Sequence, residues 1–117
     1  MFRFEELKIW KKAIEIAERL FDIATELERK KLFVFAEQLR GAALSISNNI
    51  AEGSGSNSKK EFILFLNFAK RSCFENANMI ILFEKLGYLR TQLKQDLLSE
   101  LEDLCQMISS FIKTLRS

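Results

Sequence analysis

The side chains that could carry out catalysis or bind a metal are few in this chain. There is no histidine among the 117 residues, which removes the commonest general base and the commonest transition-metal ligand together. The two cysteines, Cys73 and Cys105, are too few for a zinc cluster of four Cys or His ligands. Gly53-Ser54-Gly55 follows no strand pattern and is interpreted as a connector, not as a phosphate-binding loop. We therefore expect no enzymatic activity, no metal and no cofactor.

One polar constellation stands out. Ser45, Asn49 and Glu52 lie at i, i+4 and i+7, on one face of a predicted helix. Glu52 falls near the negative end of the helix macrodipole, where a carboxylate is disfavoured, so we expect a donor to it. Two interpretations are open: a polar clasp that fixes the turn between two helices, because buried polar groups must find partners, and a patch that contacts a ligand.

Basic side chains gather in short clusters, although 18 Lys and Arg against 16 Asp and Glu leave a net charge of only +2. Dedicated nucleic-acid binders usually show a stronger basic stripe, so solvated loop ends are one interpretation of these clusters. The other is contact with RNA or DNA. The candidate nucleic-acid contacts are Arg29, Lys30, Lys31, Lys59 and Lys60.

The two cysteines are related by their distance from a predicted turn. Cys73 precedes Leu89 by as many residues as Cys105 follows it, so antiparallel packing of the flanking helices brings both to one height. A disulfide needs Cα atoms within about 7 Å, whereas packed helix axes are about 8–10 Å apart. We therefore expect two ordinary buried thiols; the alternative is a disulfide or redox pair.

Apolar residues recur at the three- and four-residue steps of amphipathic helices. The chain has no proline and only four glycines, which excludes an all-β fold rich in turns. We expect Gly53 and Gly87 to end helices, and Ser58 and Thr91 to cap the starts of the next ones. The predicted helices cover residues 5–27, 33–52, 58–86 and 91–117.

These helices predict an all-α fold, a single domain over residues 1–117 with an antiparallel up-down-up-down four-helix bundle. The first and third helices carry more apolar surface than a lone bundle of this size buries. Because monomers rarely keep large apolar patches exposed, we expect self-association as a closed symmetric ring or dimer. The longest apolar runs have five residues and the first residues contain no signal peptide, so the prediction is a cytoplasmic protein without a membrane segment.

The stretch from Gln38 to Gly53 carries a resemblance to a known family. It resembles bacterial four-helix-bundle proteins encoded within intervening sequences of 23S ribosomal RNA genes, which are also called ribosomal proteins. The rest of the chain agrees in order at Phe4, Leu7 and Trp10, at Glu61-Phe62, at Ala69, Ser72 and Glu75, and at Leu86-Gly87-Tyr88-Leu89. The family motif, taken as a structural clasp, comprises Ser45, Asn49, Ile50, Ala51, Glu52 and Gly53.

The resemblance implies a homopentameric ring of bundles and no catalytic residues. It also implies kinship with the accessory protein of diversity-generating retroelements, which works with a reverse transcriptase and nucleic acid. Two positions depart from the family pattern: Arg71, where a glycine is usual, and Ala36, where Ser or Thr is usual.

Together these observations predict a non-enzymatic, self-assembling helical bundle that binds RNA, DNA or an RNA-processing partner, such as a reverse transcriptase or a ribosome-associated protein. The alternative is a protein–protein scaffold or accessory subunit with no direct nucleic-acid contact.

Overall fold

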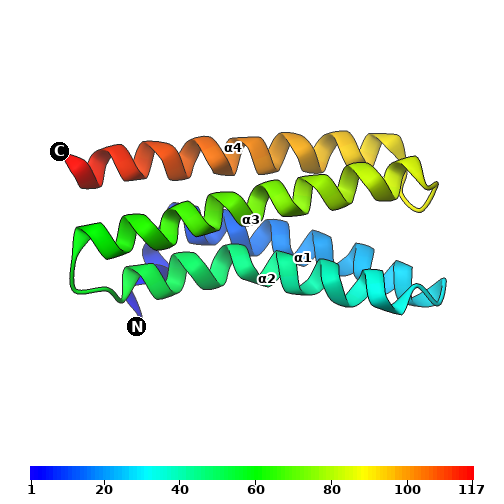
Figure 1. The fold of residues 1–117 in the computed structure, drawn as a ribbon, viewed down its shortest axis with the longest axis horizontal. Coiled ribbons are helices and arrows are strands. Elements are labelled where there is room, and N and C mark those ends of the chain that lie inside the picture. Colours follow the sequence, from blue (N-terminus) through cyan, green and yellow to red (C-terminus); the bar gives the residue numbers. More distant parts are fainter.

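The structure is a computed structural model that describes all 117 residues, and it contains helices and no strands, as the sequence predicts. The helices run antiparallel in chain order (Figure 1). One end of the bundle carries both termini and the loop between α2 and α3. The other end carries the α1–α2 and α3–α4 turns and is called the turn end below. The elements are η1 (Arg3–Glu6), α1 (Lys8–Arg29), α2 (Phe33–Ser54), α3 (Lys59–Lys85) and α4 (Thr91–Arg116).

A single core of 24 buried apolar residues runs through the bundle and draws on all four α-helices. The wide apolar face of α1 is buried by other parts of the same chain, because α1 packs against α2, α4 and η1. At its start the Phe4 ring of η1 lies 5.0 Å from the Trp10 ring. The predicted helix start at residue 5 is wrong, because Leu7 is extended (ψ 127°) and separates η1 from α1.

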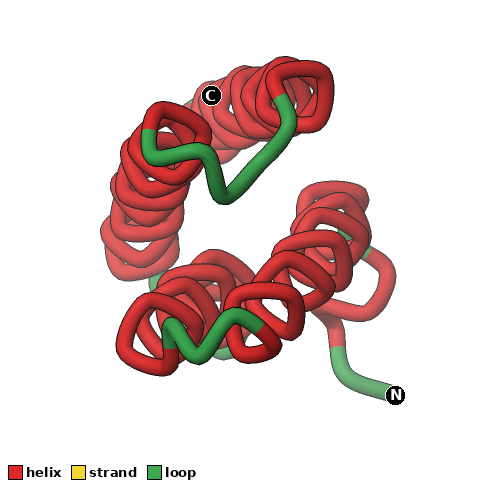
Figure 2. The backbone as a smooth tube through the Cα atoms, turned by 90° about the vertical axis from the view of Figure 1, so that its right-hand side faces the viewer, coloured by secondary structure: helices red, strands yellow, loops and turns green.

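The bundle is more open between α1 and α4 than between its other neighbouring helices (Figure 2). Charged side chains cross this seam at mid-height: Lys12 Nζ lies 3.6 Å from Glu100 Oε1, and Arg19 also pairs with Glu100. A groove of about 820 Å³ lies beside α1 and α4 toward the chain termini, and one of about 370 Å³ lies toward the turn end. Helix α4 is therefore held mainly by α3.

Two helix ends use the left-handed backbone conformation. After α3, Gly87 has φ +81°, and the N–H groups of Gly87 and Tyr88 donate back to the carbonyls of Glu84 and Phe83. This is the Schellman arrangement, and it confirms Gly87 as the stop. The same arrangement ends α1, but there Lys31 takes the left-handed position with φ 63°. A side chain with a Cβ atom is strained in that conformation.

The other predicted helix ends have mixed outcomes. Ser58 Oγ accepts a hydrogen bond of 3.1 Å from the Glu61 N–H, which confirms the N-cap of α3. Thr91 as the cap of α4 is wrong: Arg90 is the N-cap, and the Thr91 hydroxyl donates to Glu84 instead. Gly53 as a terminator is also wrong, since α2 continues to Ser54.

None of the helices combines the length and the hydropathy needed to cross a bilayer. No group of three or more Cys, Asp or Glu side chains converges as a metal site would require.

Replacing Lys31 with glycine should stabilise the protein. Lys31→Gly removes the left-handed strain, so we expect the free energy of unfolding to rise by about 1 kcal/mol. Urea denaturation followed by circular dichroism measures the change. Lys30→Gly is the matched control, since it removes the same charge at a residue with φ −87°. A gain for Lys30→Gly equal to that for Lys31→Gly would contradict the strain argument.

Candidate functional site

The residues of the motif between Ser45 and Gly53 lie along the contact between α2 and α3. Gly53 is buried in the last turn of α2, where a Cβ atom would lie 2.8 Å from Phe62 Cδ1 and 2.8 Å from Phe65 Cβ. Real Cβ atoms do not approach other atoms this closely. The glycine is therefore required by the approach of α3 and not by any need to end the helix.

The Phe62 side chain, which packs against Gly53, contacts several other elements at this end of the bundle. The buried Phe62 ring also lies 5.5 Å from the Phe111 ring of α4 in an edge-on arrangement. The Arg3 guanidinium of η1 lies 5.1 Å from the centre of the same ring, which suits a cation–π contact. Phe62 therefore joins η1, α2 and α4 to the start of α3.

A row of polar side chains continues this contact toward the middle of the helices. The hydroxyls of Ser45 and Ser72 are hydrogen-bonded across α2 and α3 at 2.7 Å. Asn49 Nδ2 donates to the Ser45 carbonyl at 2.7 Å and to its hydroxyl at 3.1 Å. Ser45 and Asn49 are thus hydrogen-bonded to each other, and Ser45 is linked to Ser72 of α3.

Glu52 takes no part in these hydrogen bonds. Its side chain is exposed, and none of the side-chain hydrogen bonds or ion pairs of the chain involves it, so the expected donor to Glu52 is not found. The helix reaches two residues beyond Glu52, and solvent can hydrate the carboxylate there. Ile50 is fully buried in the core, and the half-buried Ala51 accepts a hydrogen bond from Ser54 through its carbonyl at 2.7 Å.

Asn76 extends the polar row and is not predicted from the sequence. It is fully buried in α3, and its Nδ2 donates to the Ala42 carbonyl of α2 at 2.8 Å and to the Ser72 carbonyl at 2.7 Å. Its Oδ1 has no partner. The signal in the sequence is the spacing of four residues between Ser72 and Asn76, which places both on the face that meets α2.

The predicted basic residues lie at opposite ends of the bundle. Arg29, Lys30 and Lys31 lie at the turn end, whereas Lys59 and Lys60 begin α3 at the other end (Figure 1). Arg29 pairs with Glu26 of its own helix. Lys30 Nζ lies 3.4 Å from the Tyr88 carbonyl and 5.8 Å from the centre of the Tyr88 ring. The structure therefore does not unite the five candidates in one surface.

The fold adds two cations to the turn end that the sequence alone does not connect with it. Lys85 ends α3 and Arg90 precedes α4, and both are exposed. Arg90 lines the 370 Å³ groove together with Lys30 and Tyr88. The sequence could have indicated this placement through Gly87. This residue ends α3, and in an antiparallel bundle the α3–α4 turn lies at the same end as the α1–α2 turn.

Three carboxylates at the turn end already have partners. Arg40 donates two hydrogen bonds to Glu28, at 2.8 and 2.7 Å, and these bonds hold the pKa of Glu28 below its usual range. Glu26 pairs with Arg29, and Glu84 accepts from Thr91. Lys30, Lys31, Lys85 and Arg90 therefore form no ion pair within the chain. These four residues are called the basic turn patch below.

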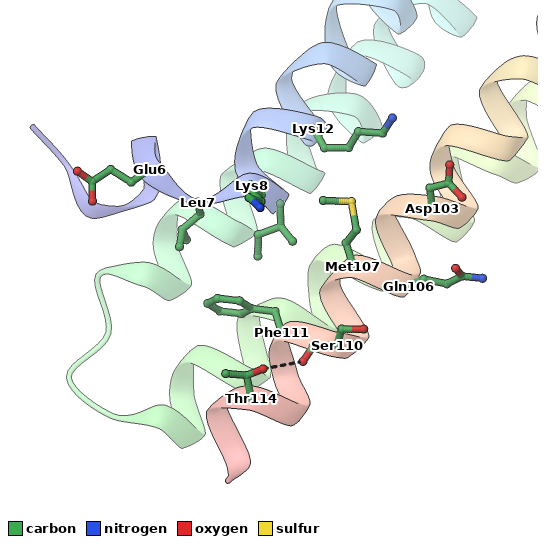
Figure 3. A pocket seen from close by; sticks show the side chains of 11 residues that line it. Glu6, Leu7, Lys8, Lys12, Asp103, Gln106, Met107, Ser110, Phe111 and Thr114 are labelled. Atoms are coloured by element: carbon green, nitrogen blue, oxygen red, sulfur yellow. Dashed lines mark hydrogen bonds between the residues drawn. The ribbon is translucent and has the colours of Figure 1, made fainter.

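The largest groove lies beside the α1–α4 seam and is mixed in chemistry (Figure 3). Met107 and Phe111 project from α4 toward α1, and Lys12 and Asp103 lie along the rim. Thr114 donates to the Ser110 carbonyl at 3.2 Å within α4. No pair of titratable groups in the lining is arranged for acid–base chemistry, so the groove shows no catalytic constellation.

Comparison with known proteins agrees with the fold. The family model of the 23S rRNA-intervening sequence protein matches residues 5–110. The chain belongs to this family. A crystal structure of a protein of unknown function from the S23 ribosomal protein family of Bacteroides thetaiotaomicron VPI-5482 has the same fold. Its TM-score is 0.84 at 24% identity, with 90% of this chain and 98% of that chain covered. No curated protein matches the chain.

A methyl group at Gly53 should disturb the contact between α2 and α3. Because one of the clashing atoms, Phe65 Cβ, is fixed to the backbone, we expect Gly53→Ala to lower the free energy of unfolding by roughly 1–3 kcal/mol. Denaturant unfolding measures it. Gly41→Ala is the matched control: Gly41 lies in the same helix with nothing within 4 Å of its added Cβ, so helix propensity should raise stability by about 1 kcal/mol. A stabilised Gly53→Ala variant would contradict the close-approach argument.

Proposed function

We propose that this protein is a non-enzymatic helical bundle that assembles with copies of itself, as a homopentamer, and contacts the phosphate backbone of RNA or DNA through its basic turn patch. A reverse transcriptase or a ribosome-associated protein is the class of partner that this proposal includes. The observation that carries the assembly is the uncovered apolar face of α3. The observation that carries the nucleic-acid contact is the set of unpaired cations at the turn end.

Helix α3 exposes several large apolar side chains, interspersed with polar ones such as Arg71 and Glu75. Its exposed side chains include Phe74 at 70% and Leu64 at 51% exposure, and none of the other helices covers them. The expectation that α1 also carries an excess of exposed apolar surface is wrong, since α1 exposes no large apolar side chain. Burying a face of this kind against another copy removes apolar area from water, which favours association. The exposed apolar residues of α3 are Leu64, Phe68, Phe74, Ile81, Leu82 and Leu86.

Light scattering coupled to size exclusion tests the assembly. We expect a mass of 68 kDa, which is five copies of 13.6 kDa. Phe74→Glu and Leu82→Glu, both at exposed positions, should reduce the assembly to smaller species while leaving the helical circular dichroism spectrum unchanged. Leu44→Glu, at an exposed apolar position of α2, is a control outside the α3 face. A wild-type protein with the mass of one chain at micromolar concentration would overturn the assembly.

The basic turn patch is suited to phosphate groups. Its four cations come from two separate turns that the fold brings to one end, and none of them forms an ion pair, although Asp22 and Glu26 line the same groove as Lys30 and Arg90. Lysine and arginine that neutralise phosphates release condensed counterions, so binding of this kind weakens as salt rises. The patch offers no side-chain constellation that reads bases, so we expect little sequence preference.

Titration of RNA and DNA at several salt concentrations tests the contact. We expect the triple variant Lys30→Gln, Lys31→Gln and Arg90→Gln to weaken binding and to reduce the slope of log K against log salt by about 1 for each phosphate that is no longer neutralised. The matched control is Lys59→Gln with Lys60→Gln, which removes charge at the opposite end of the bundle and should leave the slope unchanged. Absence of any salt-dependent binding by the wild type would favour the scaffold alternative.

A further inference from the structure

The only two cysteines of the chain lie on the α3–α4 hairpin. Cys73 of α3 is buried, and Cys105 of α4 is partly exposed. Both side chains line the same groove between the two helices, in keeping with the equal height predicted from the turn. The expectation of two ordinary buried thiols is wrong for Cys105.

Both sulfurs line a groove of about 550 Å³ that opens to solvent between α3 and α4. Its wall is mostly apolar and includes Phe74, Ile81 and Leu98, of which Phe74 is 70% exposed. A small reagent can therefore reach the thiol pair from outside the bundle. Glu102 and Gln106 of α4 and Asn78 of α3 supply the polar part of the lining.

The charges around the pair favour one thiolate. The interaction with Cys73, and to a lesser extent the charge of Lys70 of α3, outweigh desolvation and Glu102 and together lower the pKa of Cys105 to about 7. The pKa of Cys73 is raised strongly by its interaction with the Cys105 thiol and by burial. The thiolate is the nucleophilic form of cysteine, so Cys105 is the attacking group and Cys73 stays protonated while Cys105 is ionised.

We propose that Cys73 and Cys105 form a redox-active dithiol, in which Cys105 reacts with low-molecular-weight disulfides entering the groove and Cys73 resolves the product to an intramolecular disulfide. The observation that carries it is the placement of two cysteines, one buried and one partly exposed, in the wall of the same open groove. The reaction needs no nucleic acid, but Phe74 and Ile81 belong both to this groove and to the exposed apolar residues of α3, so it requires an assembly that leaves the groove open.

The reaction is a pair of thiol–disulfide exchanges. The Cys105 thiolate attacks one sulfur of the reagent, a bond forms between them, the sulfur–sulfur bond of the reagent breaks, and the released half takes a proton from solvent. Once Cys105 is bonded to half of the reagent, it carries no charge and no longer raises the pKa of Cys73. Cys73 then loses its proton and attacks the Cys105 sulfur, and the second half of the reagent leaves as a thiol. The protein loses two electrons, and the reagent gains them.

The disulfide would have its main effect on α4. This helix faces α1 across the open seam and is otherwise held by α3. A disulfide at mid-height therefore fixes α4 to α3. The link constrains the unfolded chain to a loop, which is the usual source of stabilisation by a disulfide.

Oxidised glutathione is the probe for the native, full-length protein. After reaction at pH 7, denaturation and thiol counting should find no free thiol, and the intact mass should fall by that of two hydrogen atoms. The rate should fall about fivefold from pH 7 to pH 6, because the thiolate fraction of Cys105 falls by that factor. Two free thiols after reaction, a wild-type adduct that keeps glutathione, or a disulfide between chains would each overturn the proposal.

Three variants separate the roles of the groups. Cys73→Ala should stop at a stable glutathione adduct on Cys105, and Cys105→Ala should react at least tenfold more slowly than the wild type. Lys70→Gln keeps both thiols and should move the midpoint of the pH profile upward, a shift that a structural role for Lys70 would not produce. Equal rates for Cys105→Ala and the wild type, or an unmoved midpoint in Lys70→Gln, would contradict the assignment.

Discussion

The missing side chain at Gly53 sets how closely the ends of α2 and α3 approach, and the other elements at that end depend on this distance. Phe62 occupies the space that a Cβ atom would take, and its ring meets Phe111 of α4 and Arg3 of η1. A larger residue at position 53 would displace Phe62 and, through it, both neighbours. The glycine at this position is therefore a packing requirement.

The two halves of the bundle differ in how they are held together. The central pair, α2 and α3, combines close backbone approach with the hydrogen bond between Ser45 and Ser72. The outer pair, α1 and α4, meets through the ion pairs of Glu100 and is flanked by grooves. Ion pairs that are partly exposed contribute little to stability. We infer that α2 and α3 form the stable centre and that α4 is the helix most free to change its position.

The sequence is informative where a local signal determines the structure. Ser58 and Gly87 act through hydrogen bonds to their own turns, so their roles can be predicted from the residues beside them. The prediction for Gly53 is wrong because a glycine near a helix end is typical of a terminator, whereas here its reason lies in another helix. Asn76 and Arg90 of the basic turn patch could not be predicted for a similar reason. The hydrogen-bond partner of Asn76 and the neighbours of Arg90 come from segments distant in the chain. The donor expected at Glu52 follows from the helix dipole, but an exposed carboxylate has water as its alternative partner.

Asn76 also discriminates between alternative alignments of α2 and α3. Helix α3 is apolar on most sides, so its hydrophobic pattern alone would tolerate sliding by one or two turns along its neighbour. Sliding would carry the Asn76 amide away from the Ala42 carbonyl. The bond to Ser72 within α3 would remain, but one of the two buried N–H donors would lose its partner, at a cost of roughly 1–3 kcal/mol. The amide thus penalises slipped pairings more than it stabilises the native one, and it selects a single register for the hairpin as it folds.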